Sequence, residues 1–170
     1  MAGIIGGRTA SDMPGLDIAE QRAWQHFLDA ALRLYGTINH MLTDEHKLTL
    51  NDVRLLDLLA KSPTGAARMG DLAEALMSLP SRVTREIQRL EVQGLVNRGA
   101  SPEDGRGVVA TITEEGRMAL ADAMRTYGAA VRSHFLDRLS RPQVAAMGEN
   151  CRRISTGLRT GAPSAKVGRV

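Results

Sequence analysis

The sequence predicts a mainly α-helical protein that carries one hairpin, an all-α fold with a small β-wing (α+β). Apolar residues make up 43% of the 170 residues but aromatic residues only 3%, so aliphatic side chains have to fill the core. That composition favours helices packed on helices. Apolar positions recur at the 3–4 spacing of helices over most of the chain. Two short β-rich runs, 95–98 and 108–112, flank a polar loop and supply the hairpin.

The first predicted helix begins after Asp17, which suits an N-cap, and reaches about Leu42. Its apolar residues, Trp24 and Phe27 among them, keep the helical spacing. Residues 1–16 are rich in Gly and small side chains without a sustained period, and we expect a mobile N-terminal arm there.

The second predicted helix opens at residues 49–52, where Thr49 and Asp52 fit a capping box with Asp in place of Glu. Residues 53–59 are apolar nearly all round, so this helix should be central to the fold. Residues 62–65 (Ser-Pro-Thr-Gly) should end it.

A helix-turn-helix pattern follows. A short helix at 69–76 meets a break at Met77, and a second helix begins with Ser78 as N-cap and Pro80 near its first position. Gly94 ends that helix, and the two β-rich runs follow. The order of helix, tight turn, helix and hairpin predicts a winged helix-turn-helix, whose second helix would enter the major groove of DNA.

Two further helices are expected after the hairpin. Thr113 should cap a helix that runs to about Leu139, and residues 140–143 form a second capping box that opens a last helix ending near Leu158. Residues 159–170 are Gly-rich and basic, and we expect a disordered tail.

The predicted 80–93 helix should turn Val83, Ile87 and Leu90 inward and polar side chains outward. Arg can bond both guanine acceptors and Gln both adenine groups, and a good bidentate contact discriminates by ~1–3 kcal/mol. We therefore assign DNA binding to the outward residues Ser81, Arg82, Arg85 and Gln88, with Thr84 and Arg89 at the margins.

The alternative is an ordinary solvated helix face, on which Arg85 or Arg89 pairs with Glu86 or Glu91. The adjoining hairpin favours the DNA interpretation. Arg106 lies on its Gly-flanked loop, where a cation can enter a narrow minor groove, and Asp104 could hold that guanidinium as wing support.

Bulk charge does not argue for DNA binding. The chain carries +3, but residues 68–117 hold seven Arg against eight acidic residues, whereas residues 132–170 hold eight basic against two acidic residues. The hypothesis of DNA binding therefore depends on where the cations lie and not on the net charge. A winged-helix module that binds protein and not DNA remains the alternative, because it would explain the near-neutral charge.

Over about residues 17–158 the chain resembles the MarR family of bacterial transcriptional regulators. The Asp-x-Arg element of the family's wing appears here as Asp104-Gly105-Arg106. The matching stretches are Leu72-Ala73, Val83-Thr84-Arg85, Arg89-Leu90-Glu91, Gly94-Leu95-Val96, Arg98, Pro102-Glu103-Asp104-Gly105-Arg106 and Ile112-Thr113-Glu114-Glu115-Gly116-Arg117.

This resemblance implies a homodimeric, sequence-specific regulator of double-stranded DNA. Residues 17–48 and 114–158 would form a helical dimerisation region, and 49–113 the winged helix-turn-helix lobe. Two copies would bind a pseudo-palindromic operator. The family further implies a repressor whose DNA affinity falls when a small, often aromatic and anionic, effector binds; no residue is assigned to that effector.

Other function classes find little support. No catalytic motif appears, so we expect no enzyme and no cofactor; the rival, a small enzyme using a His and a carboxylate, rests only on the presence of such residues. His40, Asp44 and His46 are close in sequence, but we assign no metal site to them. The single Cys151 excludes an intrachain disulfide, and no run of 18 apolar residues occurs. We expect a cytoplasmic protein that does not bind membranes.

Overall fold

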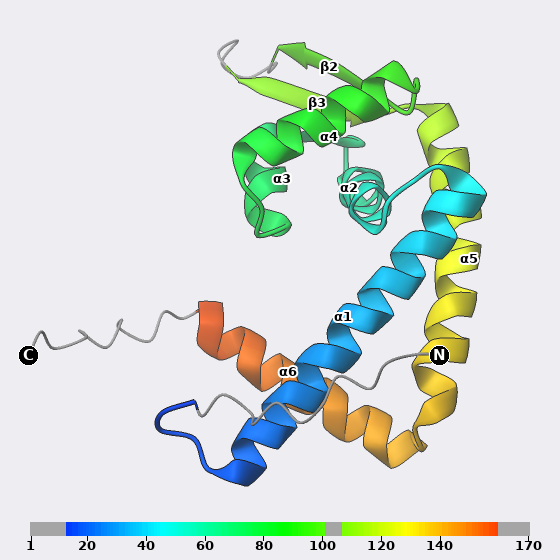
Figure 1. Cartoon of the computed structure of the whole chain (residues 1–170). Helices are drawn as coiled ribbons and strands as arrows, with labels where there is room; N and C mark the ends of the chain where they lie inside the picture. Colours follow the sequence, from blue (N-terminus) through cyan, green and yellow to red (C-terminus); the bar gives the residue numbers. More distant parts are fainter. Residues whose placement is uncertain (1–12, 101–106, 160–170) are drawn as a thin grey trace, which may run out of the picture. The chain divides into compact units, whose positions relative to one another are not determined.

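A computed structural model describes residues 13–100 and 107–159, which form helices and one small sheet (Figure 1). The described residues divide into two compact units, one up to Thr37 and the other from Ile38 onward. The predicted arm at 1–16 and tail at 159–170 lie almost wholly outside the described residues. The elements are α1 Ile18–His46, α2 Leu50–Lys61, β1 Ala66–Arg68, α3 Met69–Ala75, α4 Pro80–Val92, β2 Val96–Ala100, β3 Val108–Ile112, α5 Glu114–His134, the 3-10 helix η1 Leu136–Arg138 and α6 Arg141–Arg159.

The predicted class, all-α with a small β-wing, is confirmed. Long helices make up most of the described residues, and the strands form a single sheet. Within these residues no helix has both the length and the apolar character needed to cross a lipid bilayer.

α1 begins, as predicted, at a cap made by Asp17. Its Oδ1 accepts hydrogen bonds from the backbone N–H of Ala19 at 2.7 Å and of Glu20 at 2.9 Å, and Glu20 Oε2 accepts from the Asp17 N–H at 2.8 Å. These three bonds satisfy backbone donors that the first turn of a helix leaves without a partner.

The predicted end of α1 at Leu42 is wrong, because the helix continues to His46. Residues 43–46 are polar and lack an apolar repeat, so the pattern did not indicate the last turn. Lys47 follows with a positive φ of 58°, a conformation in which the helix cannot continue.

α2 opens with the predicted capping box. Thr49 Oγ1 accepts from the Asp52 N–H at 3.1 Å, and Asp52 Oδ2 accepts from the Thr49 N–H at 2.7 Å. Leu55, Leu56 and Leu59 have no exposed surface, which confirms the central position expected of this helix. α2 contacts α5, β1 and β3.

A three-stranded antiparallel sheet, in the order β1-β3-β2, takes the place of the predicted two-stranded hairpin. β2 pairs with β3 from Val96 opposite Ile112 onward. β1 pairs on the other side of β3, with Ala66 opposite Thr111. The sequence did not indicate β1, because a strand of three residues with no alternating pattern depends on a partner far along the chain.

The turn between α3 and α4 is tight. Met77 has a φ of 49°, and the Ser78 N–H donates to the Ala73 carbonyl at 2.9 Å. The predicted N-cap role of Ser78 is wrong, because its backbone closes the end of α3. Leu79 holds the N-cap position without a side-chain bond, and Pro80 is the first residue of α4.

Thr113 caps α5 as predicted, since its Oγ1 accepts from the Gly116 N–H at 3.0 Å. The predicted continuous helix to Leu139 is wrong. α5 ends at His134, and Phe135 leaves the helical conformation with φ −121° and ψ −61°.

η1 follows that break, and α6 comes next. The Ser140 N–H donates to Gln143 Oε1 at 2.8 Å, which is one bond of the capping box predicted there.

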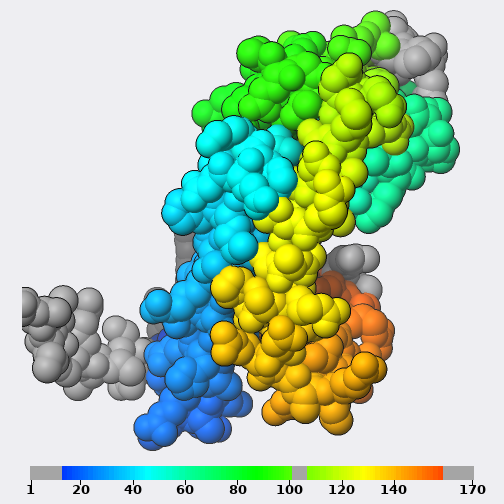
Figure 2. Space-filling model, turned by 90° about the vertical axis from the view of Figure 1, so that its right-hand side faces the viewer, coloured from blue at the N-terminus to red at the C-terminus, as the bar shows by residue number. Residues whose placement is uncertain are grey.

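The last turns of α1, drawn in cyan, lie against α5, drawn in yellow (Figure 2). Thr126 Oγ1 on α5 donates to Glu45 Oε2 at 3.0 Å and lies 2.8 Å from His46 Nε2. These polar contacts fix the 38–46 end of α1 on α5 within one unit.

Candidate nucleic-acid interface

The α4 helix presents a polar face because its opposite face is held in the core. Val83, Ile87 and Leu90 have no exposed surface, so the predicted inward orientation is confirmed. Four of the predicted DNA-binding residues on this helix are exposed, and one is half-buried. The exposed residues are Ser81, Arg82, Arg85 and Gln88, and the half-buried one is Thr84.

Arg85 lies on the side of α4 farthest from the core, flanked by Ser81 and Gln88. Within the described residues its guanidinium makes no hydrogen bond or ion pair, so its five N–H donors are available to a ligand. The pairing of Arg85 with Glu86 or Glu91, the alternative considered from the sequence, does not occur. Thr84 is less available, because its Oγ1 donates to the Pro80 carbonyl at 2.9 Å.

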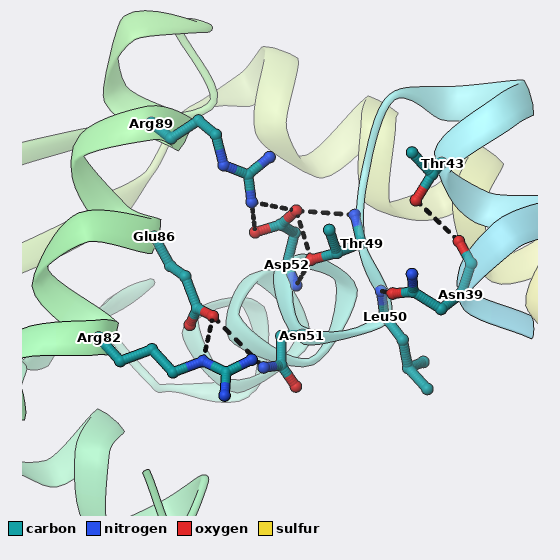
Figure 3. Close-up of polar contacts among 9 residues, drawn as sticks. All are labelled: Asn39, Thr43, Thr49, Leu50, Asn51, Asp52, Arg82, Glu86 and Arg89. Carbon is teal, nitrogen blue, oxygen red and sulfur yellow. Dashed lines mark hydrogen bonds and ion pairs between the residues drawn. The ribbon is translucent and has the colours of Figure 1, made fainter. Parts of the chain in front are cut away.

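Arg82 lies on the flank of α4 that faces α2. Its Nε donates to Glu86 Oε1 at 3.1 Å, and Asn51 Nδ2 at the start of α2 donates to the same oxygen at 3.3 Å (Figure 3). The Arg82 side chain is 57% exposed, whereas that of Glu86 is 14% exposed. The Arg82 guanidinium is thus bonded to the largely buried carboxylate of Glu86 and is still accessible to solvent.

Arg89 is the second basic residue on this flank, and its partner is Asp52. Its Nη2 lies 2.5 Å and 2.6 Å from the two oxygens of Asp52, which has no exposed surface (Figure 3). The Thr49 hydroxyl and N–H each donate to Asp52 Oδ2 at 2.7 Å. The suggested partners Glu86 and Glu91 are therefore wrong for Arg89, and sequence reasoning missed its partner.

Glu91 joins α4 to the sheet. Its Oε2 accepts from Arg98 Nε at 2.7 Å and lies 2.6 Å from Nη2 of the same residue on β2. This hydrogen-bonded guanidinium lowers the pKa of the Glu91 carboxyl. The pair connects the helix to the strand that leads into the wing loop.

The remaining predicted residues, Arg106 and Asp104, lie outside the described residues, in the segment 101–106 between β2 and β3. Their assignments therefore stay predictions. The strands on either side of that segment pair up to Ala100 opposite Val108.

The basic side chains of α4 line a shallow hollow that also contains Glu86. Its lining consists of Arg82, Arg85, Glu86 and Arg89. Two of the three guanidiniums are paired with carboxylates on the side toward α2, so the unopposed positive charge of the hollow belongs to Arg85. The near-neutral net charge of 68–117 therefore does not prevent α4 from presenting an unopposed cation on its exposed face, because this depends on where the charges lie.

A second groove lies between the end of α1 and α5, within one unit. It is lined by Met41, Glu45, His46, Asp122, Arg125, Thr126 and Ala129. His40 and Asp44, considered for a metal, form an i,i+4 pair at 3.3 Å, and among the described residues no three metal-ligating side chains gather.

The comparisons with known proteins agree on one family. The sequence model of the MarR family matches residues 46–107. HTH-type transcriptional repressor Rv2887 of Mycobacterium tuberculosis is 34% identical over 96 residues, which cover 56% of this chain and 67% of the repressor. The chain is therefore similar in sequence to a protein that is named as a transcriptional repressor.

Solved structures extend the likeness to nearly the whole chain. Sco3205, a MarR family transcriptional regulator from Streptomyces coelicolor solved in complex with DNA, is 32% identical with a TM-score of 0.80, covering 91% of this chain and 96% of that one. AbsC, another MarR family regulator from the same organism, is 31% identical with a TM-score of 0.79, covering 87% and 99%.

Proposed function

The chain belongs to the MarR family of transcriptional regulators and is not an enzyme, and we propose that it binds double-stranded DNA in a sequence-specific manner as a homodimer. The lobe at 49–113 would contact the operator, and residues 17–48 and 114–158 would form the dimerisation region. Such a regulator works where the chromosome is, in the cytoplasm.

One observation carries the proposal of DNA binding. The α4 helix holds the guanidinium of Arg85, which has no partner among residues 13–100 and 107–159, at the centre of an exposed face whose neighbours Ser81 and Gln88 have hydrogen-bonding side chains. Burial of the opposite face fixes the rotation of the helix, so these three groups project together. A guanidinium and an amide on one helical face suit the acceptor and donor pattern of base edges in the major groove.

The other assigned residues have positioning roles. Arg82 and Thr84 lie on the two sides of the exposed face, where phosphates flank a helix in the major groove. Arg106 would reach the minor groove or backbone from the wing, with Asp104 as its support. The relative Sco3205 was solved in complex with DNA, which supports a DNA partner for this chain.

Exposed apolar side chains support the homodimer. On α1, Leu32 is 64% and Trp24 47% exposed, and on α6, Leu158 is 79% exposed. The exposed apolar residues of α1 recur at helical spacing and form a stripe (Trp24, Phe27, Leu28, Leu32 and Tyr35), and a contiguous apolar surface marks an interaction site. A two-fold axis relating two copies would place two α4 helices on one face of a pseudo-palindromic site, with half-sites about 34–36 Å apart.

We further propose that the chain is a repressor whose DNA affinity a small aromatic, anionic effector lowers. The relative Rv2887 is described as a transcriptional repressor. An effector of this kind must bind more tightly to one arrangement of the two winged helix-turn-helix lobes of the proposed dimer than to the other. A compound that raises the melting temperature of the protein and weakens its DNA complex would identify it.

The test is a gel shift with DNA from upstream of the chain's own gene at several salt concentrations. We expect the complex to weaken steeply with salt and the Arg85→Ala variant to lose affinity for that DNA more than for a scrambled duplex. Arg125→Ala, which removes an exposed Arg on α5, is the matched control. Unchanged affinity in Arg85→Ala and Arg106→Ala would refute the site, and no binding at all would favour the protein-binding alternative.

A further inference from the structure

Glu86 has an arrangement that a purely structural carboxylate does not need. Its side chain is 14% exposed, and its Oε1 accepts from both Arg82 Nε and Asn51 Nδ2. Its other oxygen, Oε2, is buried and has no hydrogen-bond partner in the described part of the chain. Leaving a buried carboxylate oxygen without a donor is unfavourable, so this arrangement of Glu86 calls for an explanation.

Asp52, on the same flank of the lobe, provides the internal comparison. Both Asp52 oxygens lie against Arg89 Nη2, and Thr49 supplies two more donors. That carboxylate is fully satisfied and joins α2 to α4. Glu86 lies about one helical turn before Arg89 and also links α4 to α2, through Asn51. Only one of its two oxygens, Oε1, accepts hydrogen bonds from the described residues.

Arg82 also uses only part of its hydrogen-bonding capacity in its contact with Glu86. Glu86 holds Arg82 through Nε alone, and within the described residues both terminal Nη atoms of Arg82 make no hydrogen bond. A guanidinium bonded only at Nε still has free the edge formed by its two Nη groups, and that edge can donate two hydrogen bonds to a phosphate. The nearby carboxylate offsets part of its positive charge.

We propose that Glu86 is a positioning residue that acts through Arg82 to raise selectivity for the operator over other DNA. This inference rests on the proposed function. Glu86 keeps Arg82 in one orientation, in which its Nη groups meet a phosphate only when α4 is seated in register. The charge of Glu86 also weakens the attraction of Arg82 to phosphates when α4 lies in any other register. Non-specific binding comes mostly from such attraction to phosphates, so Glu86 should reduce it.

The variant Glu86→Gln tests this, because it removes the charge and keeps the size and the acceptor for Asn51. The probes are a duplex from upstream of the chain's own gene and a scrambled duplex of equal length and composition. We expect Glu86→Gln to bind the scrambled duplex several-fold more tightly at low salt, with a salt slope steeper by about 0.9, the value for one added phosphate contact. The affinity ratio between the two duplexes should fall.

Two further variants separate positioning from simple charge and from folding. Glu91→Gln removes the same charge from the same helix, but its partner is Arg98, so its salt slope should stay closer to that of the wild type. In an Arg82→Ala background, Glu86→Gln should change neither slope nor ratio. A thermal melt of each variant checks that the fold is intact.

The outcomes discriminate clearly. Equal effects of Glu86→Gln with and without Arg82, or equal effects of Glu86→Gln and Glu91→Gln, would reduce Glu86 to bulk charge and overturn the inference. Selective wild-type binding with an unchanged ratio in Glu86→Gln would overturn it while the proposed function stands. A wild-type chain that binds neither duplex would overturn both.

Discussion

The guanidinium of Arg89 on α4 reaches the fully buried carboxylate of Asp52 on α2, with Nη2 within 2.5–2.6 Å of both oxygens. The two residues are 37 positions apart, and the same Asp52 closes the capping box of α2. One carboxylate therefore sets both the start of α2 and the position of α4. The exposed face of α4 takes its orientation from this link and from the apolar residues beneath it.

Loss of the Arg89 cation should destabilise the lobe markedly. Arg89→Met keeps a long side chain but leaves Asp52 buried without its counter-charge, and breaking such a pair costs about 3 kcal/mol. The two hydrogen bonds from Thr49 place the expected loss at this lower end of the usual range. Urea unfolding followed by circular dichroism measures it.

Arg82→Met is the matched control on the same helix. Its ion pair with Glu86 is more exposed, so we expect a loss below about 1 kcal/mol. If Arg89→Met and Arg82→Met had the same free energy of unfolding, the Asp52–Arg89 pair would contribute no more to stability than the more exposed Arg82–Glu86 pair.

Gly116 should be a site where a single added methyl group is not tolerated. A Cβ there would lie 2.1 Å from the Leu95 carbonyl oxygen and 2.9 Å from Ile112 Cγ1, so backbone would have to move. Gly116→Ala should therefore cost about 2 kcal/mol, since overpacking outweighs the helix propensity of Ala. The Gly128→Ala variant, also on α5, meets nothing within 4 Å and should gain up to about 1 kcal/mol. A lower melting temperature for both variants would contradict this.

The parts of the fold that sequence reasoning found are those fixed by neighbouring residues. The 3–4 spacing of Val83, Ile87 and Leu90 set the rotation of α4, and the capping residues Thr49 and Thr113 marked where α2 and α5 begin. Each of these signals is complete within one or two helical turns, so it can be interpreted without the rest of the molecule.

What the sequence left open depends on partners distant along the chain. Arg89 had nearer candidates in Glu86 and Glu91, and only the packing of α2 on α4 brings Asp52 to it. β1 is a strand because β3 lies beside it. The break of α5 at Phe135 has no Pro or Gly to mark it, so the apolar spacing continued through it.

The Glu91–Arg98 pair should make stability depend on pH in acid. Arg98 lowers the pKa of Glu91 below its ordinary value, so the folded state binds the proton less readily than the unfolded state. The stabilisation is present above the ordinary Glu pKa and is lost as pH falls through the lowered one. Wild type should thus exceed Glu91→Gln in unfolding free energy at neutral pH, and the gap should close in acid. A gap that stays constant across this range would exclude the linkage.

A charge placed on the apolar stripe of α1 should break the proposed homodimer. Leu32 is 64% exposed, and a Glu there would be buried against the partner without a counter-charge. We expect Leu32→Glu to run as a monomer in size-exclusion chromatography with light scattering. His26→Glu, about a third of a turn away around the helix, adds the same charge on the polar side and should stay dimeric. A wild-type monomer, or dimers in both variants, would remove α1 from the interface.

Substitutions on α4 and on the wing should affect DNA binding in different ways. Gln88→Ala removes a group suited to a base edge, so affinity should fall about 5- to 150-fold, equivalent to ~1–3 kcal/mol, only for sequences that carry its preferred base pair. Arg106→Ala removes a cation suited to the backbone or a narrow minor groove, so affinity should fall for all sequences and the salt slope should decrease by about 0.9. Binding assays on a panel of single-base-pair variants of the operator at two salt concentrations separate the two patterns. A sequence-independent loss in Gln88→Ala would move this residue from the bases to the phosphates, because only a contact to a base edge depends on which base pair is present.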